Sequence, residues 1–408
     1  MLRTAGSAAL VLILLVLTWY AGCSGFSSLL TAYAAQSSQL GPTQLAVNLD
    51  PGNPDSHYMR ATILEAFDLP AAISEHQQAA LARPEDYALW LSLARARELN
   101  GDTAGAIAAA RQAVLLAPYY AQPHYQLGNI LVRAGQTEEA FRELRLAGAS
   151  NPTLLPGVID LAWRVFGGDV EFVERAIEPS TPEAYQALGQ FFRQHQEVDA
   201  AVAMYAAAGK AAEEDRRSFL AELITAKRFK EAANLWAVGR QTGAVKGVIV
   251  DPGFEEEINL YEPGFSWRVG DRIQGFKLSL DTTNPREGHT SLKIEFTGDQ
   301  DFAAPPISQL VLVEPRAHYQ MRFAVRSENI LSGGLPEVVV FDADTRKVLG
   351  QSGELPLSTN GWRDYSIDFE VGDATAAVQI AIQRRRCDRS PCPIFGRLWL
   401  DGFSLQKL

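Results

Sequence analysis

Three sets of residues recur every 34 positions in the first half of this 408-residue chain. They are Ala72, Ala106 and Ala140; Ala79, Ala113 and Ala147; and Pro84, Pro118 and Pro152. Small residues at fixed phases of such a period, with a closing proline, are typical of stacked helix-turn-helix repeats. Alanines let two helix backbones approach closely, and proline ends a helix because it lacks the N–H group that the helix needs. Since one hairpin cannot bury its apolar face alone, the period predicts an array of hairpins, an architecture that more often binds partners than catalyses reactions.

Several copies of this repeat resemble the tetratricopeptide repeat family, whose pattern is W-x2-L-G-x2-Y, then A-x3-F, then P. Trp90-x2-Leu93-Ala94 fits one copy, His124-x2-Leu127-Gly128 begins the next, and Tyr185-x2-Leu188-Gly189-x2-Phe192 begins a later one. The unit between the last two is shorter than the period requires. The resemblance implies an α-solenoid of about five to six hairpins over residues 36–238.

Ligands of this family lie against the first helices of successive hairpins, so the resemblance implies a partner-binding groove there. The outward positions expected on those helices are His57, Leu91, Arg95, Tyr125, Asn129, Arg133, Gln190 and Arg193. A surface that mixes apolar side chains with arginines and amides suits an extended protein segment that carries an acidic group. The alternative is a concave face that is merely solvated.

The first 27 residues predict a membrane segment. No charged residue stands between Arg3 and Asp50, and Ala8 to Trp19 is an almost unbroken apolar run. One interpretation is an uncleaved signal anchor, a helix from about Ala5 to Phe26 that approaches the ~20 residues needed to span a bilayer. Another is a lipoprotein signal ending at Cys23, and a fully soluble product is the third. Either membrane interpretation places the body of the protein outside the cytoplasm, in the periplasm or cell envelope.

The other two cysteines, Cys387 and Cys392, are close together in sequence and predict a disulfide. Disulfides persist in oxidising compartments, so this interpretation agrees with export. A zinc site would need two more ligands, and no histidine is near the pair. The alternative is a pair of free thiols in a cytosolic chain.

The sequence pattern changes near Gly239. Residues 239–247 predict a short linker, and period-two alternation of apolar and polar residues begins after it. Phe276–Leu280, Ser291–Phe296, Tyr319–Val325, Tyr365–Phe369 and Val378–Ile382 all alternate in this way. Residues 248–408 therefore predict an antiparallel β-sandwich, which makes the chain a multidomain protein, helical first and β afterwards.

Parts of this second region resemble jelly-roll carbohydrate-binding modules of the galactose-binding-like type. The resemblance rests on Asp251–Glu255, Phe265–Trp267, Gly288–Ile294, Gly361–Trp362 and Leu398–Leu405. It implies a structural calcium ion held by Glu255, Asp401 and the carbonyl group of Lys293, although Gly402 replaces an aspartate that the family usually has. Trp267, Trp362 and Trp399 are interpreted as packing residues, with sugar-stacking platforms as the alternative.

The net charge of the chain limits the kinds of partner that it can bind. The net charge of −11 argues against nucleic acid as a partner. The run from Arg384 to Arg386 is a local exception that we interpret as a solvated strand end, with contact to an acidic polymer or lipid headgroup as the alternative.

Phosphate-binding glycine loops, zinc-protease motifs and nucleophile elbows are absent from the sequence, so no catalytic residue is predicted. The expected function is a non-enzymatic, membrane-tethered envelope scaffold that binds protein partners, and the expected process is polysaccharide synthesis or export. The alternative is a glycan-binding protein in which the solenoid is a spacer.

Overall fold

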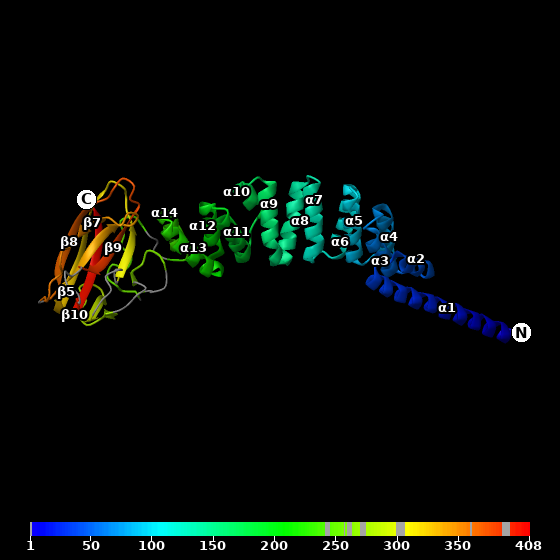
Figure 1. The fold of residues 1–408 in the computed structure, drawn as a ribbon, viewed down its shortest axis with the longest axis horizontal. Helices are drawn as coiled ribbons and strands as arrows, with labels where there is room; N and C mark the ends of the chain where they lie inside the picture. Colours follow the sequence, from blue (N-terminus) through cyan, green and yellow to red (C-terminus); the bar gives the residue numbers. More distant parts are fainter. Residues whose placement is uncertain are drawn as a thin grey trace. The chain divides into compact units, whose positions relative to one another are not determined.

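The computed structural model describes residues 2–240, 245–256, 258, 263–269, 275–298, 307–359, 361–385 and 392–408, with side chains from residue 12 onward. The chain forms two compact units, residues 1–180 and residues 181–408, which we call unit 1 and unit 2. The division falls between two helices of the repeat region. Figure 1 shows the order of the elements within each unit.

Unit 1 is entirely helical in its described residues. It begins with the long helix α1 (Leu2–Ser37) and the short helix α2 (Leu40–Leu49). Four hairpins follow, and their helices are α3 (Pro54–Leu64) with α4 (Leu69–Ala82), α5 (Tyr87–Leu99) with α6 (Thr103–Leu116), α7 (Ala121–Arg133) with α8 (Thr137–Ser150), and α9 (Leu155–Val165) with α10 (Val170–Ile177). A short 3-10 helix, η1 (Pro152–Leu154), precedes α9.

The periodic residues have the roles that the sequence predicts. All six periodic alanines are completely buried: Ala72, Ala79, Ala106, Ala113, Ala140 and Ala147. Gly128 in α7 lies so close to α8 that an added Cβ atom would come within 2.6 Å of Leu144. Several second helices start at an aspartate whose carboxylate accepts a backbone N–H, as Asp68 and Asp102 do for α4 and α6. The prediction of stacked helical hairpins is confirmed.

The described residues of unit 2 form four more helices and a β region. The helices are α11 (Pro182–Gln194), α12 (Val198–Ala208), α13 (Glu213–Thr225) and α14 (Phe229–Ala237), with the 3-10 helix η2 (Gly209–Ala212) before α13. The last helix packs directly on the β region. The Trp236 ring is buried against Phe265, with ring centroids 5.8 Å apart, and Gly264 leaves the space that the indole occupies.

The described strands form two antiparallel sheets. One has the order β1-β4-β9-β6-β7 and the other β2-β3-β10-β5-β8. The strands of the first are β1 (Arg268–Val269), β4 (Ile307–Leu312), β9 (Ala377–Arg384), β6 (Pro336–Asp342) and β7 (Val348–Gln351). Those of the second are β2 (Phe276–Asp281), β3 (Ser291–Gly298), β10 (Ile394–Lys407), β5 (His318–Ser332) and β8 (Arg363–Glu370).

Buried residues from both sheets belong to one apolar core, which includes Met321, Val338, Val378 and Leu398. Trp267, 2% exposed, is part of this core, as its interpretation as a packing residue requires. A helical region followed by an antiparallel β region agrees with the predicted order. The assignment of the β region as a jelly roll remains a prediction.

Arg384 differs from the prediction. Its residue is buried, and its side chain donates to the Gly334 carbonyl at 3.0 Å and to the Ser332 hydroxyl at 2.7 Å. The interpretation as a solvated strand end is therefore wrong for this residue, because pairing of β9 with β6 brings it to the turn that precedes β6. Arg386 and Cys387 lie outside the described residues, so the disulfide with Cys392 stays a prediction.

Candidate functional site

The first helices of three consecutive hairpins in unit 1, α3, α5 and α7, are joined by ion pairs between arginine and glutamate. Arg95 in α5 contacts Glu65, the C-cap residue of α3, with Nη2 and Oε2 2.6 Å apart, and Arg133 in α7 contacts Glu98 in α5. We call Glu65, Arg95, Glu98 and Arg133 the arginine–glutamate row. The side chains of the two arginines remain 56% and 59% exposed, whereas the glutamates are 15% and 23% exposed. The row therefore presents guanidinium groups to solvent above partly covered carboxylates.

Two other predicted groove residues lie on α7. Tyr125 and Asn129 are both half-buried, and the Asn129 side-chain amide donates to the Tyr125 carbonyl at 2.8 Å. The Tyr125 hydroxyl lies near α9, 3.6 Å from where a Cβ atom on Gly157 would be. The Tyr125 ring and the Asn129 amide thus lie on the same helix as Arg133.

His57 and Leu91 do not face outward, and that part of the prediction is wrong. They are only 6% and 5% exposed. His57 Nε2 donates to the Pro51 carbonyl at 2.9 Å, and Nδ1 lies 2.6 Å from a Glu75 oxygen. Trp90 and His124 make the same bond, each at 2.9 Å, to Pro84 and Pro118. This position closes the junction between consecutive hairpins, which explains why His57 is buried.

Gln190 and Arg193 are on α11, so they belong to unit 2. The Gln190 amide donates to Asp215 at 2.7 Å, and Arg193 forms an ion pair with Glu222. Both acceptors are on α13. An arginine–glutamate pair between first helices thus recurs in the second unit, and the predicted groove residues are divided between the two units.

Glu65 and Glu98 were not predicted. They occupy the same place in successive hairpins, 33 residues apart, as His57 and Trp90 do, and this recurrence is the signal that could have identified them. Glu65 has a second contact, because its other oxygen lies 2.8 Å from Nε2 of His76 on α4. Burial lowers the pKa of His76, although the nearby Glu65 acts in the opposite direction.

The two carboxylates predicted to bind calcium both lie near Gly253. An oxygen of Glu255 and one of Asp401 would both lie 3.6 Å from a Cβ atom on Gly253. Asp401 is fully buried and accepts N–H bonds from Arg286, Glu287 and Gly402. Glu255 accepts N–H bonds from the backbone of His289 and Thr290, at 2.8 and 3.3 Å. Burial raises the pKa of Asp401, and the three N–H bonds oppose that rise.

These contacts give both acids a structural role, since they hold the loop between β2 and β3. Calcium takes six to eight oxygen ligands, and the two side chains would supply a minority of them. Among the described residues, no group of three or more histidine, cysteine, aspartate or glutamate side chains could hold a metal ion. Lys293, in the middle of β3, pairs with Trp399 of β10 and Ser279 of β2. Calcium binding remains a prediction.

A polar cavity of about 760 Å³ lies on the second sheet. Trp399 is 5% exposed, and its indole N–H donates to Asp281 at 2.6 Å. The Arg326 guanidinium covers the Trp399 ring, 4.1 Å from its centroid, and also lies over Trp362. Burial alone would raise the pKa of Asp281, but hydrogen bonds from Thr283 and Trp399, with the charge of Lys293, lower it to about 2. At neutral pH the cavity therefore contains an ionised carboxylate near the cationic side chains of Lys293 and Arg326.

Comparison with known proteins gives limited information. No protein-family model matches the chain, and no curated protein matches it. The solved structure of MamA is similar, with 16% identity and a TM-score of 0.33, over 39% of this chain and 90% of that one. PilF of Pseudomonas aeruginosa has 12% identity and a TM-score of 0.33, over 45% and 90%. YrrB, described as a TPR protein with an unusual peptide-binding site, has 17% identity and a TM-score of 0.32, over 40% and 89%. Similarities at this level carry no inference about what this chain binds.

Proposed function

We propose that this chain is a non-enzymatic scaffold, held at a membrane by α1, that binds protein partners on the first helices of its hairpins. The observation that carries the proposal is the arginine–glutamate row, with Tyr125 on the same helix as Arg133. Each exposed guanidinium has five N–H donors, and the pair with glutamate uses only part of them. The remaining donors are able to bind a carboxylate of an extended segment, while Tyr125 supplies apolar contact.

The membrane tether is supported by composition. Leu12–Ser37 is long and apolar enough to cross a bilayer, and its most apolar stretch is almost entirely unburied. We place the body outside the cytoplasm, in the envelope, and the process in polysaccharide synthesis or export. That setting rests on the combination of a repeat array with a domain resembling carbohydrate-binding modules, and not on a site. Lipid attachment at Cys23, which is half-buried on α1, is the alternative form of the tether.

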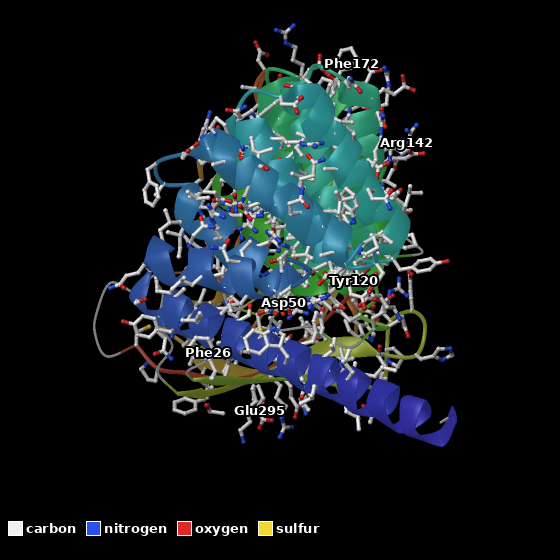
Figure 2. The ribbon with its side chains drawn as sticks, turned by 90° about the vertical axis from the view of Figure 1, so that its right-hand side faces the viewer. Phe26, Asp50, Tyr120, Arg142, Phe172 and Glu295 are labelled. Atoms are coloured by element: carbon white, nitrogen blue, oxygen red, sulfur yellow. The ribbon has the colours of Figure 1, made fainter. Side chains whose placement is uncertain are left out.

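The test is capture of partners from native membranes by the full chain, solubilised in mild detergent. The variant combines Arg95→Gln, Arg133→Gln and Tyr125→Ala. Arg142→Gln is the matched control, because Arg142 is also 59% exposed but lies on the second helix α8 (Figure 2). We expect the triple variant to lose partners that the control keeps. If every partner stays bound to the triple variant, the groove assignment is wrong.

Glycan binding by unit 2 is the second candidate, and the polar cavity favours it. Hydroxyl, carboxylate and cationic groups line it, as recognition of a polyol with a charged group requires. The buried rings of Trp267 and Trp399 favour the scaffold as the first candidate, since neither is free to stack on a sugar. Thermal melting of the chain with a panel of soluble glycans decides between them. A glycan-dependent rise in the melting temperature that Lys293→Met abolishes would favour glycan binding over the scaffold as the main function.

A further inference from the structure

Helix α1 has two parts with different surroundings. Figure 1 shows it as one helix whose C-terminal end lies beside α2 and α3 while the other end projects away from them. In the projecting part the apolar side chains are exposed, for example Leu12 at 65% and Trp19 at 76%. In the last third, Ser27, Thr31 and Ala34 are at most 9% exposed. Their spacing of four and three places them on one face of the helix.

This face is attached to the array by hydrogen bonds as well as by packing. The Ser27 hydroxyl donates to the Ala46 carbonyl of α2 at 2.9 Å. The Ser56 hydroxyl of α3 lies 3.0 Å from that of Ser27 and 2.8 Å from that of Thr31. Buried hydroxyls are stable only when they are hydrogen-bonded, so this cluster fixes the rotation and position of α1 on the array. The end of α1 is therefore the first helix of the repeat array.

The lengths leave no room for a flexible linker. A helix rises about 1.5 Å per residue, so the distance from Arg3 to Ser27 is about 36 Å, and the hydrocarbon core of a bilayer is about 30 Å thick. If Arg3 lies at one surface, Ser27 lies within about one to two turns of the other. From this we infer that the membrane-spanning helix and the first helix of the array are one rigid rod, so that the lipid bilayer sets the orientation of unit 1. The inference rests on the proposed membrane tether.

Gly22 and Gly25 lie between the two parts and define the competing arrangement, a hinge. Glycine weakens a helix relative to alanine. Nothing lies within 4 Å of a Cβ atom added at either position, so packing does not require glycine there. Alanine at both positions would thus stiffen the helix without a clash. The pair of substitutions separates a rod from a hinge.

The experiment measures the distance between spin labels on genetically encoded side chains in place of Leu15 and Ala108, in the full chain in lipid nanodiscs. Both positions are exposed. We expect one narrow distance, unchanged by Gly22→Ala with Gly25→Ala. Ala34→Glu should abolish the narrow peak by disrupting the docked face, and Ala35→Glu, on the exposed side, should keep it. If Ala34→Glu loses helical content by circular dichroism, Ser56→Ala is the milder substitution, and it should broaden the peak.

A broad distribution that narrows in the double alanine variant would show a hinge and overturn the inference. A broad distribution that the double variant leaves broad would overturn it as well. Carbonate extraction of native membranes separates this result from failure of the tether itself. A chain that leaves the membrane fraction contradicts the proposed function, whereas a retained chain with broad distances contradicts only the rigid rod.

Discussion

Gly128 and Gly157 offer a matched test of how closely the hairpins pack. Both are in helices, yet a Cβ atom on Gly128 would lie 2.6 Å from Leu144 Cγ and 3.1 Å from the Ala140 carbonyl oxygen. At Gly157 the nearest atom, the Tyr125 hydroxyl oxygen, is 3.6 Å away, which is ordinary contact. The same substitution, glycine to alanine, therefore meets an overpacked interface at one site and an ordinary van der Waals contact at the other.

The expected effects have opposite signs. Alanine stabilises a helix by about 0.5–1 kcal/mol relative to glycine, and overpacking a tight interface costs about 1–3 kcal/mol. Gly157→Ala should therefore raise the free energy of unfolding by up to about 1 kcal/mol, and Gly128→Ala should lower it by about 0.5–2 kcal/mol. Urea unfolding followed by far-ultraviolet circular dichroism measures both. If Gly128→Ala stabilises the chain as much as Gly157→Ala does, the packing argument for the periodic small residues is refuted.

Three further predictions concern polar contacts. His124→Leu removes the bonds to Glu143 and the Pro118 carbonyl and should cost about 1–3 kcal/mol of stability, measured by the same unfolding assay. Burial lowers the pKa of His76 in the folded state, so below the unfolded-state pKa the unfolded chain binds more protons than the folded chain. The free energy of unfolding should therefore fall as the pH drops from 7 to 5. His76→Leu should weaken this pH dependence, and an unchanged slope would contradict the prediction. Asp281 has a folded-state pKa of about 2, so its ionised carboxylate stabilises the fold at pH values above the unfolded-state pKa. This contribution is lost as the pH falls toward 2. In thermal melts, Asp281→Asn should reduce the loss of stability at acidic pH.

The helical array was predictable because its determinants are local. Burial of Ala72, Ala106 and Ala140 follows from a period that the sequence displays directly. The groove residues were harder to assign, because a shift of one residue rotates a side chain by about 100° around the helix. For example, His57 was assigned to the groove but is buried, while Tyr58, the next residue, is 37% exposed.

Contacts between distant residues could not be read from the pattern. Arg95 pairs with Glu65 only because two hairpins stack, and the sequence of either helix alone does not determine how the hairpins are rotated relative to each other. The polar cavity shows the same limit. Asp281, Lys293, Trp399 and Arg326 come from four strands that are adjacent in the order β2-β3-β10-β5, which is not their order in sequence.

The most direct test of partner binding is photocrosslinking in the native host. A photoreactive side chain replaces Tyr125 in one full-length variant and Arg142 in the other, so that the first-helix face and the second-helix face are compared in the same protein. The account predicts discrete, protein-sized adducts from position 125 and none of these from position 142. Equal adducts from both positions, or none from position 125, would contradict the claim that the chain binds partners on its first helices.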